Sequence, residues 1–255
     1  MSSAPRIMAH LVAGFPNREA SIDVARGLAD GGCAYLEVQF PFSDPTADGP
    51  DIQRACAAAL DAGFTVGEGF QIIAEIRRGV SVPIFVMSYA NLLFTRGIRG
   101  FLRSAAAAGA RGMIVPDLPP DYDEGLFEEA KAAGLAAVPV VSPSMRPERL
   151  ERIGALRPEW IYATLRIGTT GACTAIDQPG LSFLERVRAV SSGQAKVLGG
   201  FGISTAAQVS ALAPRVHAVV IGSAFVREVV AGGDVYARLR AKMEELAGLQ
   251  TRLTG

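Results

Sequence analysis

The sequence predicts an α/β protein, and three observations indicate one closed barrel of parallel strands. A helical stretch that ends in glycine is repeatedly followed by a short apolar run, as in LADGGCAYLEV, AAAAGARGMIV and KAAGLAAVPVV. Each run is continuously apolar, as expected of a parallel strand that is buried on both faces. Eight such runs within 255 residues fit a (β/α)8 or TIM barrel. A doubly wound open sheet is the alternative, and the even number of strands and the lack of an early GxGxxG sequence disfavour it.

The individual elements follow from local sequence. The predicted strands, in chain order, are IMAHLVA (7–13), AYLEV (34–38), PIFVM (83–87), GMIVP (112–116), AAVPVV (136–141), WIYATL (160–165), AKVLGG (195–200) and HAVVIG (217–222). Amphipathic helical stretches between them include EASIDVARGLAD (19–30), IRGFLRSAAAA (98–108) and YDEGLFEEAKAA (122–133). Glycine after such a stretch predicts a left-handed cap that ends the helix. Residues 234–253 are expected to form the closing helix, and residues 1–255 one barrel domain.

The connection between the second and third strands is longer than the others. It begins with QFPFSDPTADGP, residues 39–50, in which three prolines restrict the backbone. Pro50 is expected in the first turn of the helix that follows. Because barrel enzymes build their active sites at the carboxyl ends of the strands, this insertion is predicted to be a catalytic loop.

Composition narrows the function classes. Lys+Arg and Asp+Glu both number 25, so no basic surplus indicates a nucleic acid or a membrane surface as a partner. The first residues lack the long apolar core of a signal peptide, and no apolar stretch is long enough to span a bilayer. The three cysteines form no CxxC and are expected to be reduced thiols, which predicts a cytoplasmic protein. The expected partners are therefore small molecules or another protein.

Two carboxylates are candidate catalytic groups. Glu37 lies in an otherwise apolar strand, where burial raises the pKa of a carboxyl group and suits it to general acid–base chemistry. A structural ion pair, or a side chain that faces the helices, is an equally good interpretation from position alone. Asp48 precedes a glycine in the proline-rich loop, so an ordinary turn is the simpler explanation for it.

Glycine-rich segments follow three of the later strands and predict a phosphate site. They are RIGTTG (166–171), GGFGIS (199–204) and IGSAFV (221–226). In such barrels, backbone N–H groups and a helix N-terminus after the seventh and eighth strands hold an anion. A phosphorylated ligand is therefore expected.

Apolar residues at the same ends of the strands suit a flat aromatic group, although core packing is the better explanation for each one alone. They are Met87, Tyr89, Ile114, Tyr162 and Phe201. Lys196 opens the seventh predicted strand, at the wrong end for a Schiff base, which disfavours a lysine-dependent aldolase. His10 and His217 have no ligand spacing, which disfavours a zinc aldolase. No metal and no cofactor are predicted.

The sequence LEVQFPFSDPTADGPDIQ resembles the hallmark of the tryptophan synthase α subunit family, a strand glutamate followed by PFSDP-x-ADGP-x-IQ. The resemblance extends along the chain through SYANLLF, VPDLPPDY, YATLRIGTTG, GGFGIS and VVIGSAFV. It implies retro-aldol cleavage of indole-3-glycerol phosphate to indole and glyceraldehyde 3-phosphate. It also implies a pyridoxal-phosphate β subunit as partner, in an α2β2 complex that receives the indole.

The resemblance also implies residue roles. Glu37 matches the general acid–base, and Asp48 matches the carboxylate that stabilises positive charge on the indole nitrogen. Tyr162 matches a pocket tyrosine, and Thr170 matches a threonine that helps to hold the catalytic aspartate. Residues 166–176 match a mobile loop that closes over the substrate. The phosphate-binding positions are matched by Gly171, Phe201, Gly202, Gly222 and Ser223. Positions at or near the β-subunit contact are matched by Pro41, Asp44, Asp117 and Pro119.

Some positions depart from the family pattern. Gln39 stands where a small residue is usual, and Leu165 stands where serine is usual. The first strand starts near Ile7, which leaves no counterpart to the helix that precedes it in the family. These departures keep open a stand-alone lyase that releases free indole for secondary metabolism. A silent phosphate-binding regulatory barrel is disfavoured because both carboxylates are present. A phosphosugar epimerase is disfavoured because it needs an opposed acid–base pair on strands.

Overall fold

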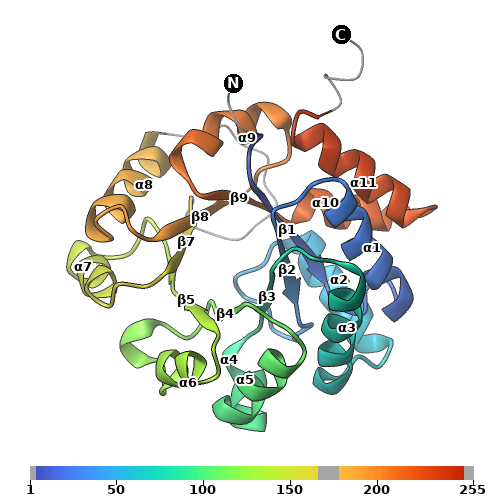
Figure 1. The fold of residues 1–255 in the computed structure, drawn as a ribbon, viewed down its shortest axis with the longest axis horizontal. Coiled ribbons are helices and arrows are strands. Elements are labelled where there is room, and N and C mark those ends of the chain that lie inside the picture. Colours follow the sequence, from blue (N-terminus) through green and yellow to red (C-terminus); the bar gives the residue numbers. More distant parts are fainter. Residues whose placement is uncertain (1–3, 166–177, 201, 250–255) are drawn as a thin grey trace.

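A computed structural model of the chain describes residues 4–165, 178–200 and 202–249. Nine parallel strands form one sheet in the order β5-β4-β3-β2-β1-β9-β8-β7-β6, and they surround a central axis (Figure 1). The strands are β1 (Ile7–Val12), β2 (Tyr35–Gln39), β3 (Ile84–Met87), β4 (Gly112–Ile114), β5 (Ala136–Val138), β6 (Val140–Val141), β7 (Trp160–Thr164), β8 (Lys196–Gly200) and β9 (Ala218–Ile221). The predicted (β/α)8 barrel is confirmed.

The fifth predicted strand, 136–141, is divided in two by Pro139. Proline has no N–H to donate to a strand ladder, so the strand is interrupted there. The first part, β5, pairs with β4, and the second part, β6, pairs with β7. The Pro139 carbonyl still accepts a hydrogen bond from Tyr162 N at 2.9 Å. Because β5 and β6 are adjacent in the chain and lie at the two ends of the sheet order, this segment closes the ring.

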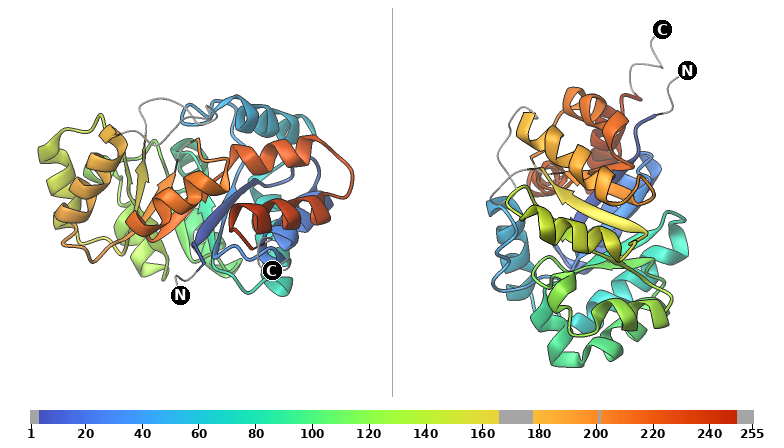
Figure 2. Two further views of the ribbon diagram at one scale, coloured as in Figure 1. Left: turned by 90° about the horizontal axis from the view of Figure 1, so that it is seen from above. Right: turned by 90° about the vertical axis from the view of Figure 1, so that its left-hand side faces the viewer.

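Helices form an outer layer around the strands, as the side views in Figure 2 show. They are α1 (Arg18–Asp30), α2 (Pro50–Asp61), α3 (Val66–Gly79), α4 (Ala90–Arg96), α5 (Ile98–Ala107), α6 (Leu126–Ala132), α7 (Pro147–Ala155), α8 (Gln178–Val190), α9 (Ala206–Leu212), α10 (Ser223–Val230) and α11 (Val235–Leu246), with 3-10 turns η1 (Pro120–Tyr122) and η2 (Ala213–Arg215). Pro50 is the first residue of α2, as predicted.

Two predicted helix boundaries were wrong. The helix expected from Tyr122 begins at Leu126, because Gly125 before it has a φ of +84° and breaks the helical path. The closing helix, expected to reach residue 253, ends at Leu246, and Gly248 follows with a φ of +68°. The predicted left-handed glycine is found after α5, where Gly109 has a φ of +92°.

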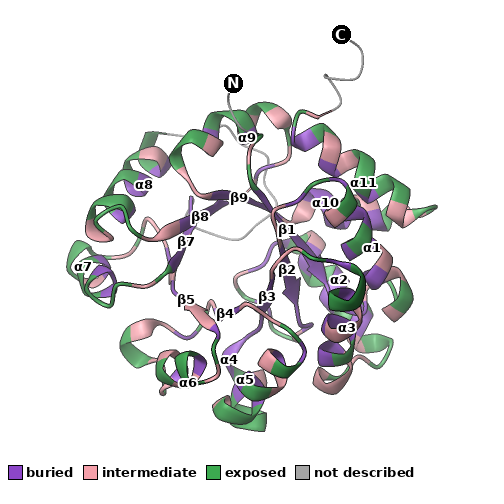
Figure 3. Cartoon of the chain, viewed as in Figure 1, coloured by how far each residue is buried: buried purple, intermediate pink, exposed green. Residues whose placement is uncertain are grey.

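The side chains of the strands alternate between two apolar cores. Ile7, Ala9 and Leu11 of β1 pack outward against the helices, whereas Met8 packs inside the barrel. On β2, Leu36 and Val38 face the helices. Most strand residues are buried, whereas the outer faces of the helices are exposed (Figure 3). This alternation turns Glu37 and Gln39 into the barrel, together with His10 of β1.

Candidate active site

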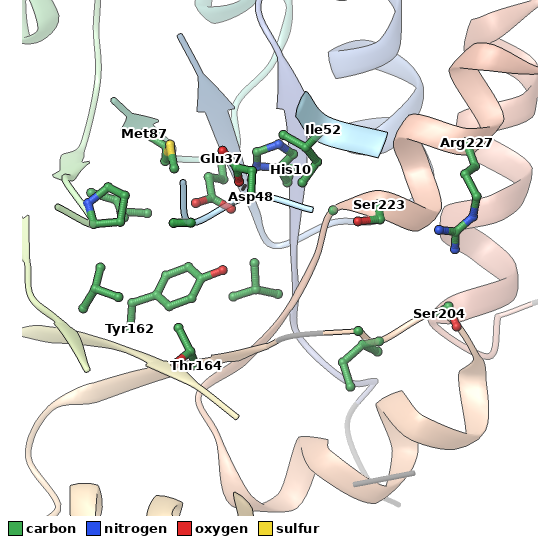
Figure 4. A pocket seen from close by; sticks show the side chains of 18 residues that line it. His10, Glu37, Asp48, Ile52, Met87, Tyr162, Thr164, Ser204, Ser223 and Arg227 are labelled. Carbon is green, nitrogen blue, oxygen red and sulfur yellow. Dashed lines mark hydrogen bonds and ion pairs between the residues drawn. The ribbon is translucent and has the colours of Figure 1, made fainter. Parts of the chain in front are cut away.

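A cavity at the carboxyl ends of the strands collects most of the predicted site residues. Glu37, Asp48, Ile114, Tyr162, Gly202, Gly222 and Ser223 all line it. Figure 4 shows the two carboxylates above the ring of Tyr162, with Ser223 and Arg227 to one side. A small apolar cluster of Val12, Ile52 and Val226 fixes α2 and α10 against β1 beside this cavity. The strand ends therefore bring together residues that are far apart in sequence.

Glu37 is 4% exposed and has one polar contact with another described residue. Nδ1 of His10 lies 3.3 Å from Glu37 Oε2, and His10 is also buried. The two residues are direct neighbours in the parallel ladder between β1 and β2. Burial alone would lower the pKa of His10, but the hydrogen bond to Glu37 and the charges of Glu37 and Asp48 raise it above its ordinary value.

The Asp48 carboxylate is held by hydrogen bonds from two side chains. Its Oδ2 accepts hydrogen bonds from Gln39 Nε2 at 2.7 Å and from the Tyr89 hydroxyl at 2.9 Å. Burial raises the pKa of Asp48, and this outweighs the charge of His10 and the bonds from Gln39 and Tyr89, which lower it. Gln53 Nε2 donates to the Asp48 carbonyl at 2.9 Å, so the loop backbone is anchored as well.

Gln39 departs from the family pattern and has a definite role in the geometry. Its amide nitrogen reaches Asp48 and also lies 3.4 Å from Cys56 Sγ, while its carbonyl oxygen has no hydrogen-bond partner among the described residues. Gln39 thus adds a hydrogen bond and does not crowd the loop. Leu165, the other departure, is buried in the core between strands and helices.

A helix N-terminus at the cavity suits an anion. Gly222 is the N-cap of α10 and Ser223 is its first residue, and both line the cavity. A Cβ at Gly222 would lie 3.3 Å from Ile52 Cδ1 and 3.4 Å from the His10 ring, which leaves little room for a side chain there. Arg227, one helical turn further, lines the cavity and is held by Asp51 Oδ2 at 3.0 Å.

Not every predicted residue reaches the cavity in the described structure. Tyr89 was expected at the end of β3, but it precedes α4. It is fully buried, contacts Asp48 and stacks on Phe42. Met87 and Ile114 do line the cavity. Thr170, Gly171, Phe201 and the loop 166–176 lie outside the described residues.

Sequence reasoning missed His10 and Arg227, which both line the cavity. Ser204 also lines it and is the last residue of the predicted segment GGFGIS. His10 was considered only as a metal ligand. The alternation in IMAHLVA could have found it, because Met8 and His10 share one face of the strand. Lys196 was placed correctly: it opens β8, far from Gly200 at the site end, and pairs with Glu159 at 3.2 Å.

These features define a class of protein: a (β/α)8 barrel enzyme with two buried carboxylates and a helix N-terminus that line one cavity. The family model described as "Tryptophan synthase alpha chain" matches residues 2–253. The chain belongs to the tryptophan synthase alpha chain family.

Individual relatives agree with this assignment. The tryptophan synthase alpha chain of Helicobacter hepaticus is 37% identical over 230 residues, which cover 88% of this chain and 85% of the relative. That of Methanothermobacter thermautotrophicus is 36% identical over 241 residues, covering 93% and 88%. A solved structure of Mycobacterium tuberculosis tryptophan synthase superposes with a TM-score of 0.88 at 34% identity, covering 96% of this chain and 92% of that chain. A mutant alpha-subunit from Pyrococcus furiosus gives 0.87 at 33%, covering 97% and 100%.

Among the helices formed by the described residues, none combines the length and the apolar character needed to cross a bilayer.

Proposed function

We propose that this chain cleaves indole-3-glycerol phosphate to indole and glyceraldehyde 3-phosphate by a retro-aldol reaction, without a cofactor. One observation carries the proposal: Glu37 and Asp48, both 4% exposed, line one apolar cavity that is also lined by Gly222 and Ser223 at the N-terminus of α10. The apolar middle, with Met87, Ile114 and Tyr162, suits the indole ring, and the helix N-terminus suits the phosphate.

The chemistry needs one proton donor that becomes a base. Glu37 gives its proton to the indole C3, which places positive charge on the ring nitrogen. The Glu37 carboxylate then takes the proton of the hydroxyl next to the ring, and the O–H electron pair forms the aldehyde carbonyl. The electron pair of the broken carbon–carbon bond returns to the ring and neutralises the nitrogen. Glu37 is protonated again at the end of the cycle.

Asp48 stabilises the intermediate in this scheme. It is the second carboxylate of the cavity, and Gln39 and Tyr89 orient it before the substrate binds. A fixed anion in a buried site lowers the energy of a developing positive charge without reorganisation. Burial beside Asp48 raises the pKa of Tyr89, so its hydroxyl keeps its proton and remains a donor.

Gln39→Leu is expected to move the acid limb of kcat/KM to higher pH. The bond from Gln39 lowers the pKa of Asp48, so its loss raises that pKa further and protonates Asp48 at a higher pH. A bond to a charged group contributes about 1.5–3 kcal/mol, so we expect turnover at neutral pH to fall about tenfold or more. A pH–rate profile measures both effects. Gln53→Leu is the matched control, since Gln53 contacts only the backbone of Asp48 in the described structure, and its acid limb should stay in place. An unmoved limb in Gln39→Leu contradicts this role.

Arg227→Met is expected to raise KM for the phosphorylated substrate about tenfold while kcat changes little. Arg227 lines the cavity beside Ser223, but its side chain is 47% exposed, so its charge is partly screened by water. Steady-state kinetics and inhibition by inorganic phosphate measure the effect. Arg54→Met is the matched control, because Arg54 also pairs with Asp51 yet does not line the cavity. Equal KM values in both variants would exclude a phosphate contact by Arg227.

A β subunit is the partner that the family implies, and we infer an α2β2 complex. The matched positions Asp44 and Asp117 are exposed on the loops around the cavity mouth, where a partner can reach them. The stand-alone lyase is not favoured, because the relatives described above are alpha chains. We also place the reaction in the cytoplasm, since Cys33 and Cys56 are buried free thiols.

Indole release by the purified chain, alone and with a β subunit added, tests the function. Slow release that the β subunit strongly accelerates supports the proposal. Fast release without acceleration supports a stand-alone lyase. No release under either condition rejects the catalytic function.

A further inference from the structure

We propose that His10 is the positioning residue of Glu37: its ring fixes the carboxyl group for proton transfer and stabilises the carboxylate after the proton has left. This inference rests on the proposed function, because it assigns Glu37 the acid–base role. Neither the sequence pattern nor the family resemblance assigned His10 a part in the reaction.

The placement of His10 follows from strand register. β1 and β2 are parallel neighbours, and their ladder sets His10 directly opposite Glu37. Both side chains point into the barrel, because the flanking residues Ala9, Leu11 and Val38 pack outward in the core against the helices. Both residues are 4% exposed, and Nδ1 lies 3.3 Å from Oε2. The contact between the two side chains is therefore shielded from bulk solvent.

The ring of His10 has one polar anchor in the described structure. Its other nitrogen, Nε2, is buried and finds no hydrogen-bond partner among the described residues. Gly222 closes against the ring, since a Cβ there would lie 3.4 Å from His10 Cδ2 and Cγ. An unpaired buried nitrogen lowers the stability of the fold. The ring nevertheless keeps the orientation in which Nδ1 contacts Glu37. The ring is thus fixed by packing and oriented by Glu37 alone.

This arrangement helps the reaction at one stage. When Glu37 gives its proton to the indole C3, a negative charge forms in a site that excludes water. A hydrogen bond from Nδ1–H to the new carboxylate stabilises that charge and keeps the other oxygen directed at the substrate hydroxyl. His10 keeps its own proton throughout, because the hydroxyl proton returns to Glu37. His10 therefore acts through Glu37.

The charges around the ring favour this donor role. Glu37 of β2 and Asp48 of the following loop act on His10, and together they outweigh the effect of burial and raise its pKa. Tyr162 of β7 and Arg227 of α10 are the other titratable groups that line the cavity with it. β9, the other neighbour of β1, contributes Ala218–Ile221, which carry no titratable side chain.

Two replacements of His10 separate positioning from packing. His10→Leu keeps an apolar side chain of fair size but removes the donor, and we expect kcat to fall at least tenfold with KM within about twofold. His10→Gln retains an N–H donor, and we expect it to recover most of this loss. In a Glu37→Gln background, His10→Leu should cause no further loss, because the group it positions is gone. His217→Gln is the control, since His217 bonds to the Tyr35 hydroxyl at 2.8 Å and does not line the cavity.

A second readout does not depend on turnover. NMR titration of the two histidine rings should place the pKa of His10 above 6.5 and that of His217 below it. Glu37→Gln should lower the pKa of His10 and leave His217 unchanged. Unaltered kcat in His10→Leu, or an unaltered His10 titration in Glu37→Gln, would overturn the proposal. If the wild-type chain releases no indole although Glu37→Gln alters the His10 titration, the proposed function fails and the catalytic use of the pair fails with it.

Discussion

Glu37→Gln is expected to lower indole release by at least a thousandfold. The glutamine side chain fits the same buried space but can neither give a proton to the indole C3 nor take one from the substrate hydroxyl. Binding of inorganic phosphate should stay within about twofold, because Ser223 belongs to α10 and lies to one side of the two carboxylates (Figure 4). Single-turnover kinetics of indole release and a phosphate titration measure the two effects.

The control for this variant is Glu159→Gln. Glu159 is also a barrel glutamate with basic partners, Arg111 and Lys196, but it lies before β7, at the end away from the cavity. Its replacement should leave indole release unchanged. Turnover like that of the wild type in Glu37→Gln would show that another group carries the proton.

Asp48→Asn is expected to lower turnover by a factor of about 10²–10³, a loss typical of removing one preorganised electrostatic group. The asparagine can still bond to Gln39 or Tyr89, but it no longer neutralises charge on the indole nitrogen. Indole release under saturating substrate gives the number. Asp44→Asn, in the exposed part of the same loop, should leave the activity of the chain without its β subunit unchanged. Similar losses in both variants would indicate damage to the loop rather than a charge effect.

The fold should survive this change, and the direction of the pKa shift explains why. The folded pKa of Asp48 lies above its ordinary value, mainly because of burial. A raised carboxyl pKa means that the folded state favours the protonated form, so stability is lost as pH rises through that pKa. At neutral pH, Asp48→Asn should therefore unfold at a denaturant concentration equal to or above that of the wild type. The difference between the two proteins should shrink toward pH 4.

Much of the fold follows from local sequence. Each strand is specified by its own apolar run and by the glycines that flank it. The predicted strand bounds therefore agree with the structure to within one or two residues, except for the strand that Pro139 divides. The errors were at helix boundaries, where the amphipathic pattern of the sequence extends beyond the helix itself. Gly125 interrupts a pattern that still looks helical, and Gly248 ends the last helix before its apolar pattern stops.

The site divides in the same way. The sequence alone predicted the two carboxylates and the anion site, because a long contiguous motif carries Glu37 and Asp48 and a short loop carries Gly222 and Ser223. Only the tertiary structure decided which groups surround those carboxylates. His10 lies beside Glu37 because β1 and β2 pair in one register, and Tyr89 reaches Asp48 across 41 residues of sequence. Hydrogen bonds and pKa values depend on distances in space, and those distances exist only once the strands have closed into a barrel.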